Sequence, residues 1–204
     1  MVQILENITW LGHAGFKIKG EKTVYIDPFK IRDSEPADII IITHEHFDHL
    51  SPEDLKNIQT GNTVVVTTPD CYSKVSGNVK TISPGRTLIV DGIKIEAVPA
   101  YNVNKKFHPK ANGWIGVVVN INGKRIYHAG DTDDIPEMSG LKNIDIALLP
   151  VSGTYVMTAE EAADAANKIM PKIAVPMHYG AIVGTHVDAE KFKKLCRCKV
   201  EILS

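Results

Sequence analysis

The chain has 204 residues, of which 44% are hydrophobic and 23% are charged, and its formal net charge is −1. This composition is typical of a globular protein and excludes a disordered or collagen-like chain. The apolar runs are far shorter than the roughly 20 residues of a membrane helix, and the basic stripe of a dedicated nucleic-acid binder is missing from the sequence.

The N-terminus, the cysteines and the lack of a linker-like run indicate where the protein is located and how many domains it has. The N-terminus lacks the basic start and apolar core of a signal peptide, so we expect a cytoplasmic protein. Cys71, Cys196 and Cys198 fit neither a disulfide framework nor a CxxC metal site, and we interpret them as reduced thiols. No Ser/Gly-rich or Pro-rich run divides the sequence, so residues 1–204 are predicted to form a single domain.

The first part of the chain predicts short strands that are interrupted by Gly, Pro and Asp. These strands cover residues 8–11, 15–18 and 24–26, and they suggest an antiparallel meander. The four isoleucines of residues 39–42 favour a strand that is buried on both faces. Ser51 followed by Pro52 is typical of a helix start, and this helix should end near Gln59.

Further strands and helices alternate along the rest of the chain. Strands are predicted near residues 63–67, 79–82, 87–90, 93–98, 114–121, 124–128, 144–150, 172–180 and 199–203. Helices are predicted near residues 70–75, 158–170 and 188–196. Thr158 and Glu161 form a capping-box pattern, and Asn122-Gly123 is a strong hairpin signal. Because helices follow buried strands, the pattern predicts two packed sheets with helices outside, an α+β sandwich.

A dense group of metal-ligand side chains, His44-Glu45-His46-Phe47-Asp48-His49, directly follows the isoleucine strand. In an extended segment, residues 44, 46 and 48 point to one side. Imidazole and carboxylate groups bind zinc, iron or manganese, and no structural role requires four of them in six residues. The motif therefore predicts a metal site rather than a histidine-rich turn. By the same alternation, Phe47 should anchor the loop in the core and Glu45 should face away from the metal.

This HxHxDH motif resembles the signature of the metallo-β-lactamase superfamily. The stretches WLGHAGF, YIDPF, YHAGDTD and VPMHYG match further family motifs, in the expected order along nearly the whole chain. The chain is similar to the branch of metal-dependent hydrolases related to ascorbate-6-phosphate lactonase and to the phospholipase D that cleaves N-acyl phosphatidylethanolamines. The resemblance implies a four-layer αβ/βα sandwich of two mixed β-sheets with helices outside. It also implies two divalent metal ions, zinc in the first place and manganese or iron as alternatives.

The resemblance assigns a role to each residue that matches a family motif. His44 and His46 would bind one ion, and Asp48 and His49 would bind the second. Asp131 would bridge the two ions, and His178 would complete the second site. Both Asp131 and His178 follow a predicted strand and lie near glycine, which allows close approach of the backbone.

One position departs from the family pattern. Where relatives have a third histidine of the first site, the stretch VPAYNVNKKFHP has Asn102, and the nearest histidine is His108. We favour His108 as the replacement ligand; the alternative is that Asn102 or water takes this place. The same loop carries Lys105, Lys106 and Lys110, which would favour an anionic substrate group unless they are solvated surface lysines. Asn102 and Lys106 are the substrate contacts expected from this loop.

Other polar residues are expected around the ligands. Asp27 matches a family position that orients a metal ligand through a hydrogen bond. His13 lies on a glycine-flanked turn and is expected to be a proton donor or substrate contact, with structural hydrogen bonding as the alternative. His128 is expected beside the ligands rather than among them. Ser152 or Thr154 would bind substrate through a hydroxyl group, and we favour Thr154.

Two ions would lower the pKa of a water between them from about 15.7 to near 7, so a metal-bridging hydroxide is the expected nucleophile. Asp48 would hold this hydroxide and could accept its proton. The expected function is hydrolysis of an ester-type bond (phosphodiester, lactone or thioester) in a small anionic substrate. The alternatives are a nuclease or phosphodiesterase on nucleic acid, disfavoured by the net charge, and a redox or inactive metal-binding protein. The sequence leaves open whether the chain forms a homo-oligomer.

Overall fold

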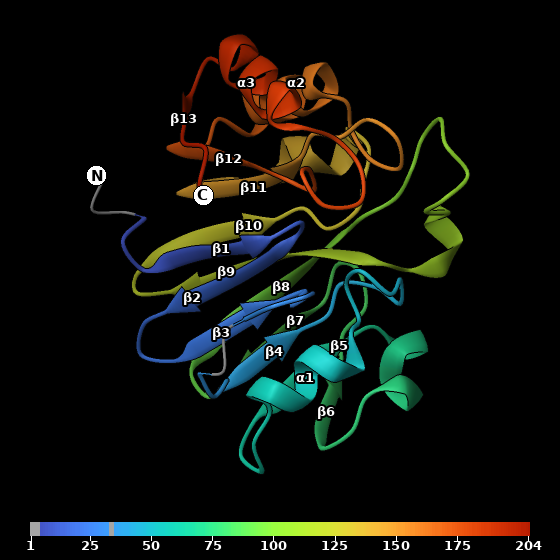
Figure 1. Ribbon diagram of the computed structural model, residues 1–204, viewed down its shortest axis with the longest axis vertical. Helices are drawn as coiled ribbons and strands as arrows, with labels where there is room; N and C mark the ends of the chain where they lie inside the picture. The colour runs from blue at the N-terminus through green and yellow to red at the C-terminus, as the bar shows by residue number, and fades with distance from the viewer. Residues whose placement is uncertain (1–4, 33–34) are drawn as a thin grey trace.

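The computed structural model describes residues 5–32 and 35–204, and its chain folds into two stacked sheets with helices on their outer faces (Figure 1). The first sheet is six-stranded, in the order β1-β2-β3-β4-β5-β6. Its strands are β1 (Ile8–Gly12), β2 (Gly15–Lys19), β3 (Thr23–Ile26), β4 (Ile39–Ile41), β5 (Val64–Thr67) and β6 (Asn78–Thr81). Strands β1 to β3 are antiparallel neighbours, whereas β3 to β6 are parallel, so the sheet is mixed.

The second sheet is seven-stranded and is also mixed, in the order β13-β12-β11-β10-β9-β8-β7. Its strands are β7 (Thr87–Val90), β8 (Ile93–Pro99), β9 (Ile115–Ile121), β10 (Lys124–His128), β11 (Ile146–Pro150), β12 (Ile173–Met177) and β13 (Lys199–Val200). The strands from β7 to β10 are antiparallel, and those from β10 to β13 are parallel. Each sheet thus begins as a meander and continues as parallel strands.

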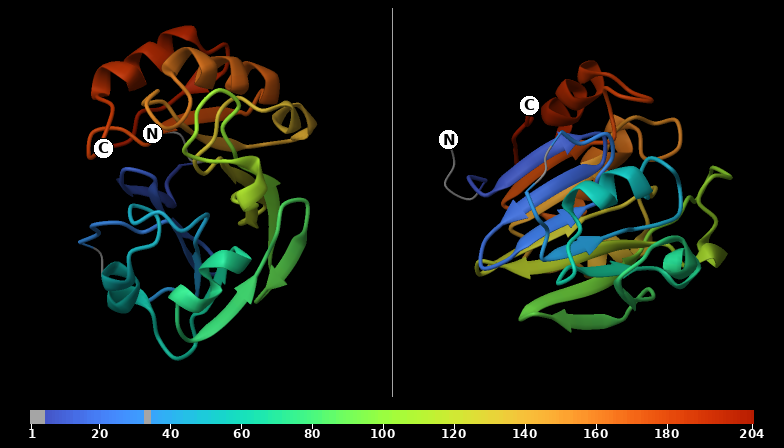
Figure 2. Two further views of the ribbon diagram at one scale, coloured as in Figure 1. Left: turned by 90° about the vertical axis from the view of Figure 1, so that its right-hand side faces the viewer. Right: turned by 60° about the horizontal axis from the view of Figure 1, so that its bottom comes forward.

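The helices cover the outer faces of the two sheets (Figure 2). They are α1 (Pro52–Ile58), α2 (Ala159–Ile169) and α3 (His186–Leu195), with short 3-10 helices η1 (Pro69–Lys74), η2 (Lys110–Asn112) and η3 (Pro136–Gly140). Helix α1 packs on the first sheet, whereas α2 contacts β11 and α3 contacts β12 of the second. Within the described residues, no helix is long and apolar enough to cross a membrane.

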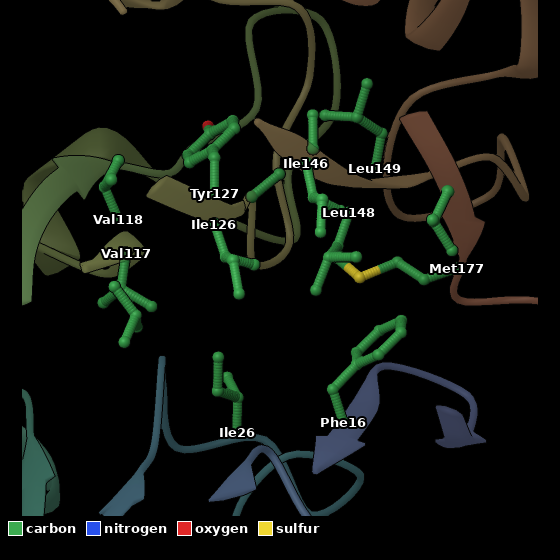
Figure 3. Packing of buried hydrophobic residues seen from close by; sticks show 14 of the residues in the cluster. Phe16, Ile26, Val117, Val118, Ile126, Tyr127, Ile146, Leu148, Leu149 and Met177 are labelled. Atoms are coloured by element: carbon green, nitrogen blue, oxygen red, sulfur yellow. The ribbon is translucent and has the colours of Figure 1, made fainter. Parts of the chain in front are cut away.

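Strand β4 shows why the first sheet lies between two apolar layers. Ile39 and Ile41 belong to the large core cluster between the sheets, whereas Ile40 and Ile42 belong to the smaller cluster under α1. All four side chains are fully buried, as the predicted two-sided burial requires. The central layer joins side chains of both sheets, including Phe16 of the first sheet opposite the second-sheet residues shown in Figure 3.

The predicted fold class, a four-layer αβ/βα sandwich of two mixed β-sheets, is confirmed by this arrangement. Three element predictions need correction. The strand predicted over residues 172–180 ends at Met177, and His178 begins the loop that follows. Residues 70–75 were expected to form an α-helix, but the structure has a 3-10 helix at Pro69–Lys74, which begins at the proline. The last strand was expected to reach Leu203, but it ends at Val200.

Candidate metal centre

The histidines and aspartates singled out from the sequence lie on loops that follow strands. Residues 44–49 lie between β4 and α1, and His108 lies between β8 and β9. Asp131 follows β10, and His178 directly follows β12. Parallel strands bring their carboxyl ends to the same edge of a sheet, so these loops can converge although they are far apart in the sequence.

The ligand-type atoms converge in two groups, and within each group they lie within 4.8 Å of one another. The first cluster contains His44, His46, His108 and Asp131, and the second cluster contains His13, Asp48, His49 and His178. Asp131 belongs to the first cluster and also contacts residues of the second. Its Oδ2 is 3.2 Å from His108 Nε2 and 3.1 Å from His178 Nε2, and its Oδ1 is 3.2 Å from His49 Nε2. One carboxylate therefore faces ligands of both clusters.

The unpartnered atoms of these clusters test whether a metal fits. Nε2 of His49, His108 and His178 and Oδ1 of Asp131 are buried, and their contacts of 3.1–3.2 Å lack hydrogen-bond geometry, so none of them has a hydrogen-bond partner among the described residues. Leaving a buried polar atom without a partner is costly, and such atoms are rare in native proteins. Nitrogen and carboxylate oxygen atoms that face one point are the donors that zinc, manganese and iron take. The residues present thus fit divalent metal ions.

Electrostatics keep two of these groups in the form that a metal ligand needs. Burial and repulsion by His49 hold the pKa of His44 well below its ordinary value, so its imidazole is neutral. Burial opposes ionisation of Asp131, but the nearby His178 and His49 keep its pKa well below the usual range. Burial also lowers the pKa of His49, but Asp131 and Asp27 outweigh it and raise that pKa well above its ordinary value.

Asp27 orients ligands from behind the clusters. Its carboxylate accepts hydrogen bonds from the backbone N–H of Thr43 (2.8 Å) and from the Thr43 hydroxyl (2.6 Å). Asp27 Oδ2 also lies 2.8 Å from His49 Nδ1, so Nε2 of His49 is left for the metal. Because the Thr43 hydroxyl donates to Asp27, its oxygen can accept from His44 Nδ1 at 3.0 Å. This arrangement leaves Nε2 of His44 facing the first cluster.

A hydrogen-bonded chain fixes His108 at the first cluster. Asn102 Oδ1 accepts from the backbone N–H of His108 (2.9 Å) and lies 3.2 Å from its Nδ1. The Asn102 amide nitrogen donates to Asp133 Oδ1 (3.1 Å) and to the Tyr155 carbonyl (2.9 Å). The amide is therefore used inside the protein. The geometry favours His108 over Asn102 beside the metal, and it does not favour Asn102 as a substrate contact.

His13 and His178 connect the two sheets at the second cluster. The backbone N–H of His178 donates to the His13 carbonyl at 2.8 Å, and the His13 ring lies 2.9 Å from Asp48 Oδ2 through Nε2. His178 Nδ1 lies 3.1 Å from the Ser152 hydroxyl, which leaves Nε2 facing Asp131. His13, Asp27 and His178 all have positive φ angles, of 49°, 46° and 60°. Such backbone is uncommon for side-chain-bearing residues and concentrates at functional sites.

Other predicted residues lie outside the clusters. His128 is buried, and its Nε2 donates to the Ala14 carbonyl at 2.8 Å while Nδ1 accepts from Gly130 N. Lys106 and Thr154 are exposed, and neither lines the cavity at the clusters. The Phe47 prediction was wrong: its side chain is 67% exposed rather than anchored in the core. The backbone turns at this point and ends the alternation on which that prediction depended.

Sequence reasoning missed several residues that support the site. Thr43 and Asp133 were not singled out, although they fix the orientations of His44 and of the His108 loop. Trp114 packs its ring 4.9 Å from that of His44 and 4.8 Å from that of His46. Thr43 could have been found from the THEHFDH stretch because it precedes the first histidine. Asp133 ends the YHAGDTD stretch, two residues after Asp131, so it too could have been found. Trp114 carries no such signal, because only the folded loops bring it to the site.

Comparison with known proteins gives the family. The domain described as the beta-lactamase superfamily domain matches residues 7–178 of this chain. The chain belongs to the metallo-β-lactamase superfamily. It is 36% identical to a "UPF0173 metal-dependent hydrolase" of Thermococcus onnurineus, and this match covers 96% of the chain and 94% of the relative. A relative of the same designation in Methanoculleus marisnigri is also 36% identical, with 92% and 87% covered.

Solved structures of the metallo-β-lactamase fold agree with this placement. A crystal structure from Parabacteroides distasonis is 36% identical and has a TM-score of 0.87, covering 97% of this chain and 93% of that one. The metallo hydrolase Igni18 from Ignicoccus hospitalis has a TM-score of 0.78 at 23% identity, covering 97% and 94%, and shows the shared fold. The chain is thus a metal-dependent hydrolase of the metallo-β-lactamase superfamily, with clusters of His and Asp that suit a metal.

Proposed function

We propose that this protein uses two divalent metal ions, zinc in the first place and manganese or iron as alternatives, to hydrolyse an ester-type bond of a small substrate. The observation that supports this proposal is the pair of adjacent clusters around Asp131, in which several buried nitrogen and oxygen atoms make no hydrogen bond within the described chain. His44, His46 and His108 would hold one ion, Asp48, His49 and His178 the other, and Asp131 both. A bound pair of divalent ions supplies acidified water and polarises a carbonyl or phosphoryl oxygen.

The side chains of the second cluster supply proton transfer in this proposal. Asp48 lines the cavity and is held by His13 at 2.9 Å, so its carboxylate has a fixed orientation toward the substrate. Burial opposes ionisation of Asp48, but the hydrogen bond from His13 outweighs it and lowers the pKa of Asp48. Asp48 Oδ2 would accept the proton of the attacking water. The His13 ring would give its Nε2 proton to the leaving group and regain one from Asp48 Oδ2, 2.9 Å away, so both groups return to their starting state.

That the substrate is anionic stays a prediction, and fewer lysines of the β8–β9 loop support it than the sequence suggested. Lys105 Nζ lies 2.6 Å from Asp133 Oδ1, and Lys110 Nζ lies 2.9 Å from Glu137 Oε1, so both charges are already paired. Exposed Lys106 is the cation of this loop that we propose for an anionic group. Phosphodiester, lactone and thioester remain the proposed bond classes.

The test combines metal content with hydrolysis. Wild-type protein loaded with zinc, manganese or iron should hold about two ions per chain and hydrolyse at least one of a chromogenic phosphodiester, lactone or thioester. His46→Ala should lose metal and activity together. His186→Ala is the matched control, because this exposed histidine pairs with Glu190 on α3 and lies outside both clusters.

The alternatives give different results in the same assay. Absence of bound metal under all three conditions would overturn the proposal. Metal binding with oxygen consumption and no hydrolysis would point to a redox protein. Cleavage of single- or double-stranded nucleic acid in preference to the small probes would identify a nuclease.

A further inference from the structure

A cavity of about 320 Å³ opens beside the two clusters, and its walls differ in chemistry. The polar part of its lining consists of His46, Asp48, His108 and Asp131. The remaining lining residues are Phe47, Phe107, Tyr155 and Ile182, which we call the apolar rim. The volume lies at the small end of the roughly 300–1,000 Å³ of ligand pockets.

The apolar rim is exposed to solvent although it consists of large hydrophobic side chains. Phe47 is 67% exposed, Phe107 49% and Ile182 39%. The Phe107 and Tyr155 rings form an edge-to-face pair at 4.7 Å, so they present one continuous surface. Apolar surface of this kind, placed next to convergent polar groups, marks a binding site in soluble proteins.

The charges around the cavity do not offset this apolar character. No lysine or arginine lines the cavity in residues 5–32 and 35–204. Lys105 is turned toward Asp133 and Glu161, at 2.6 and 3.6 Å, instead of toward the rim. A substrate group that enters on this side therefore meets hydrocarbon and ring edges.

We propose that the substrate carries a hydrocarbon group, a short acyl chain or an aryl ring, which packs under the apolar rim while the scissile bond lies against the polar wall. This inference rests on the proposed function, because it assigns the apolar part of the same substrate. Four loops, after β4, β8, β11 and β12, contribute one rim residue each. The rim thus forms only in the folded protein, together with the clusters.

Binding of alkyl hydroxamates to the zinc-loaded protein tests the inference without requiring turnover. The hydroxamate group binds metal, and the chain is lengthened from acetyl to hexanoyl. Calorimetry should show a Kd that falls about fourfold for each added methylene, the gain expected for burial of one CH₂, until the chain fills the cavity. Phe107→Ser should flatten this dependence. Ile89→Ser is the matched control, because Ile89 is a 70% exposed residue on β7 and lies outside the cavity.

A Kd that stays constant along the series in the wild-type protein would overturn the inference and leave the metal centre untouched. If the protein binds no metal, the inference can still be tested by titrating the protein with 1-hexanol and with ethanol and following its amide NMR signals. Displacement of the signals of residues 47, 107, 155 and 182 by hexanol but not by ethanol supports the inference. Displacement elsewhere overturns it. A Phe107→Ser variant that changes sedimentation but keeps the chain-length dependence would assign the rim to subunit contact instead.

Discussion

Asp133 illustrates how a residue outside the metal clusters can control one of them. Its two oxygens receive hydrogen bonds from Asn102 Nδ2 (3.1 Å) and from the backbone N–H of Val103 (2.8 Å), and Lys105 pairs with it at 2.6 Å. These contacts bind the start of the β8–β9 loop, and Asn102 in turn holds His108. Asp133 therefore positions a proposed ligand that it does not touch.

We expect Asp133→Ala to weaken metal binding at one of the two proposed sites by about 10- to 100-fold, the usual effect of removing a group that orients a ligand. Competition titration with a chromogenic chelator would measure this change. Asp134→Ala is the matched control, because Asp134 pairs with Lys168 on α2 instead of with the loop. Unchanged metal affinity in Asp133→Ala would show that His108 keeps its place without this support.

At the residue scale, the candidate ligands that stand together in one motif could be singled out from the sequence, whereas contacts between loops that fold back could not. The histidines of residues 44–49 could be singled out because four candidate ligands in six residues serve no ordinary structural purpose. The Phe47 prediction failed because the chain turns there, with Leu50 N bonded to His46 O at 2.8 Å, so strand alternation no longer applies. Asp133 was missed because its role depends on contacts between distant loops.

At the scale of elements, the strand that ends in the HxHxDH loop and the hairpin of β9 and β10 were predicted almost to the residue. Both have a strong local cause: an isoleucine run in β4 and Asn122-Gly123 between β9 and β10. The helix predicted at residues 70–75 is a 3-10 helix, because the sequence of so short a segment hardly separates α from 3-10 geometry. The pairing of β7 with β8 at the far edge of the second sheet, and the order of all strands, required the structure.

At Gly130, in the loop after β10, we expect that any side chain would destabilise the protein. Gly130 has φ +65°, and a Cβ there would lie 2.5 Å from the Ile115 carbonyl oxygen. Gly123 has φ +66°, but nothing lies within 4 Å of its Cβ position. Gly123→Ala should therefore cost about 1 kcal/mol of unfolding free energy from backbone strain alone. Gly130→Ala should cost about 3 kcal/mol, because overpacking adds to the strain. Urea unfolding of both variants would measure this, and equal losses would contradict it.

Glu96 on β8 is the centre of a polar network that links the neighbouring strands β8, β9 and β10. Burial raises the pKa of Glu96, but hydrogen bonds from Arg125, Lys94 and Asn120 outweigh it and lower the pKa from 4.5 to about 2. A depressed carboxyl pKa contributes stability above pH 4.5 that is lost as the pH falls toward 2. Glu96→Gln should cost about 1 kcal/mol at pH 7, as expected for a partly exposed network, and less at pH 3. Urea unfolding at both values would measure the difference, and an equal cost at pH 7 and pH 3 would contradict this account.

For the whole molecule, we expect stability to depend on metal, because the candidate metal clusters are buried. A ligand present at about 1,000 times its Kd stabilises the folded state by about 4 kcal/mol, and each kcal/mol shifts the Tm of a chain of this size by about 2–4 °C. Removal of metal by a chelator should thus lower Tm by about 8–16 °C in scanning calorimetry. His186→Ala should keep this shift and His46→Ala should reduce it. A Tm that does not respond to the chelator would contradict a metal held by the folded state.

Both clusters combine residues from both halves of the chain. His13, His44, His46, Asp48 and His49 come with the first sheet, whereas His108, Asp131 and His178 come with the second. Neither half contains a complete cluster, so a chain cut between β6 and β7 would yield two fragments that each lack ligands. Metal uptake would then report reassembly of the fragments, and added metal would favour the reunited pair over either piece. A metal bound there would thus join the two halves of the chain, in addition to serving the proposed chemistry.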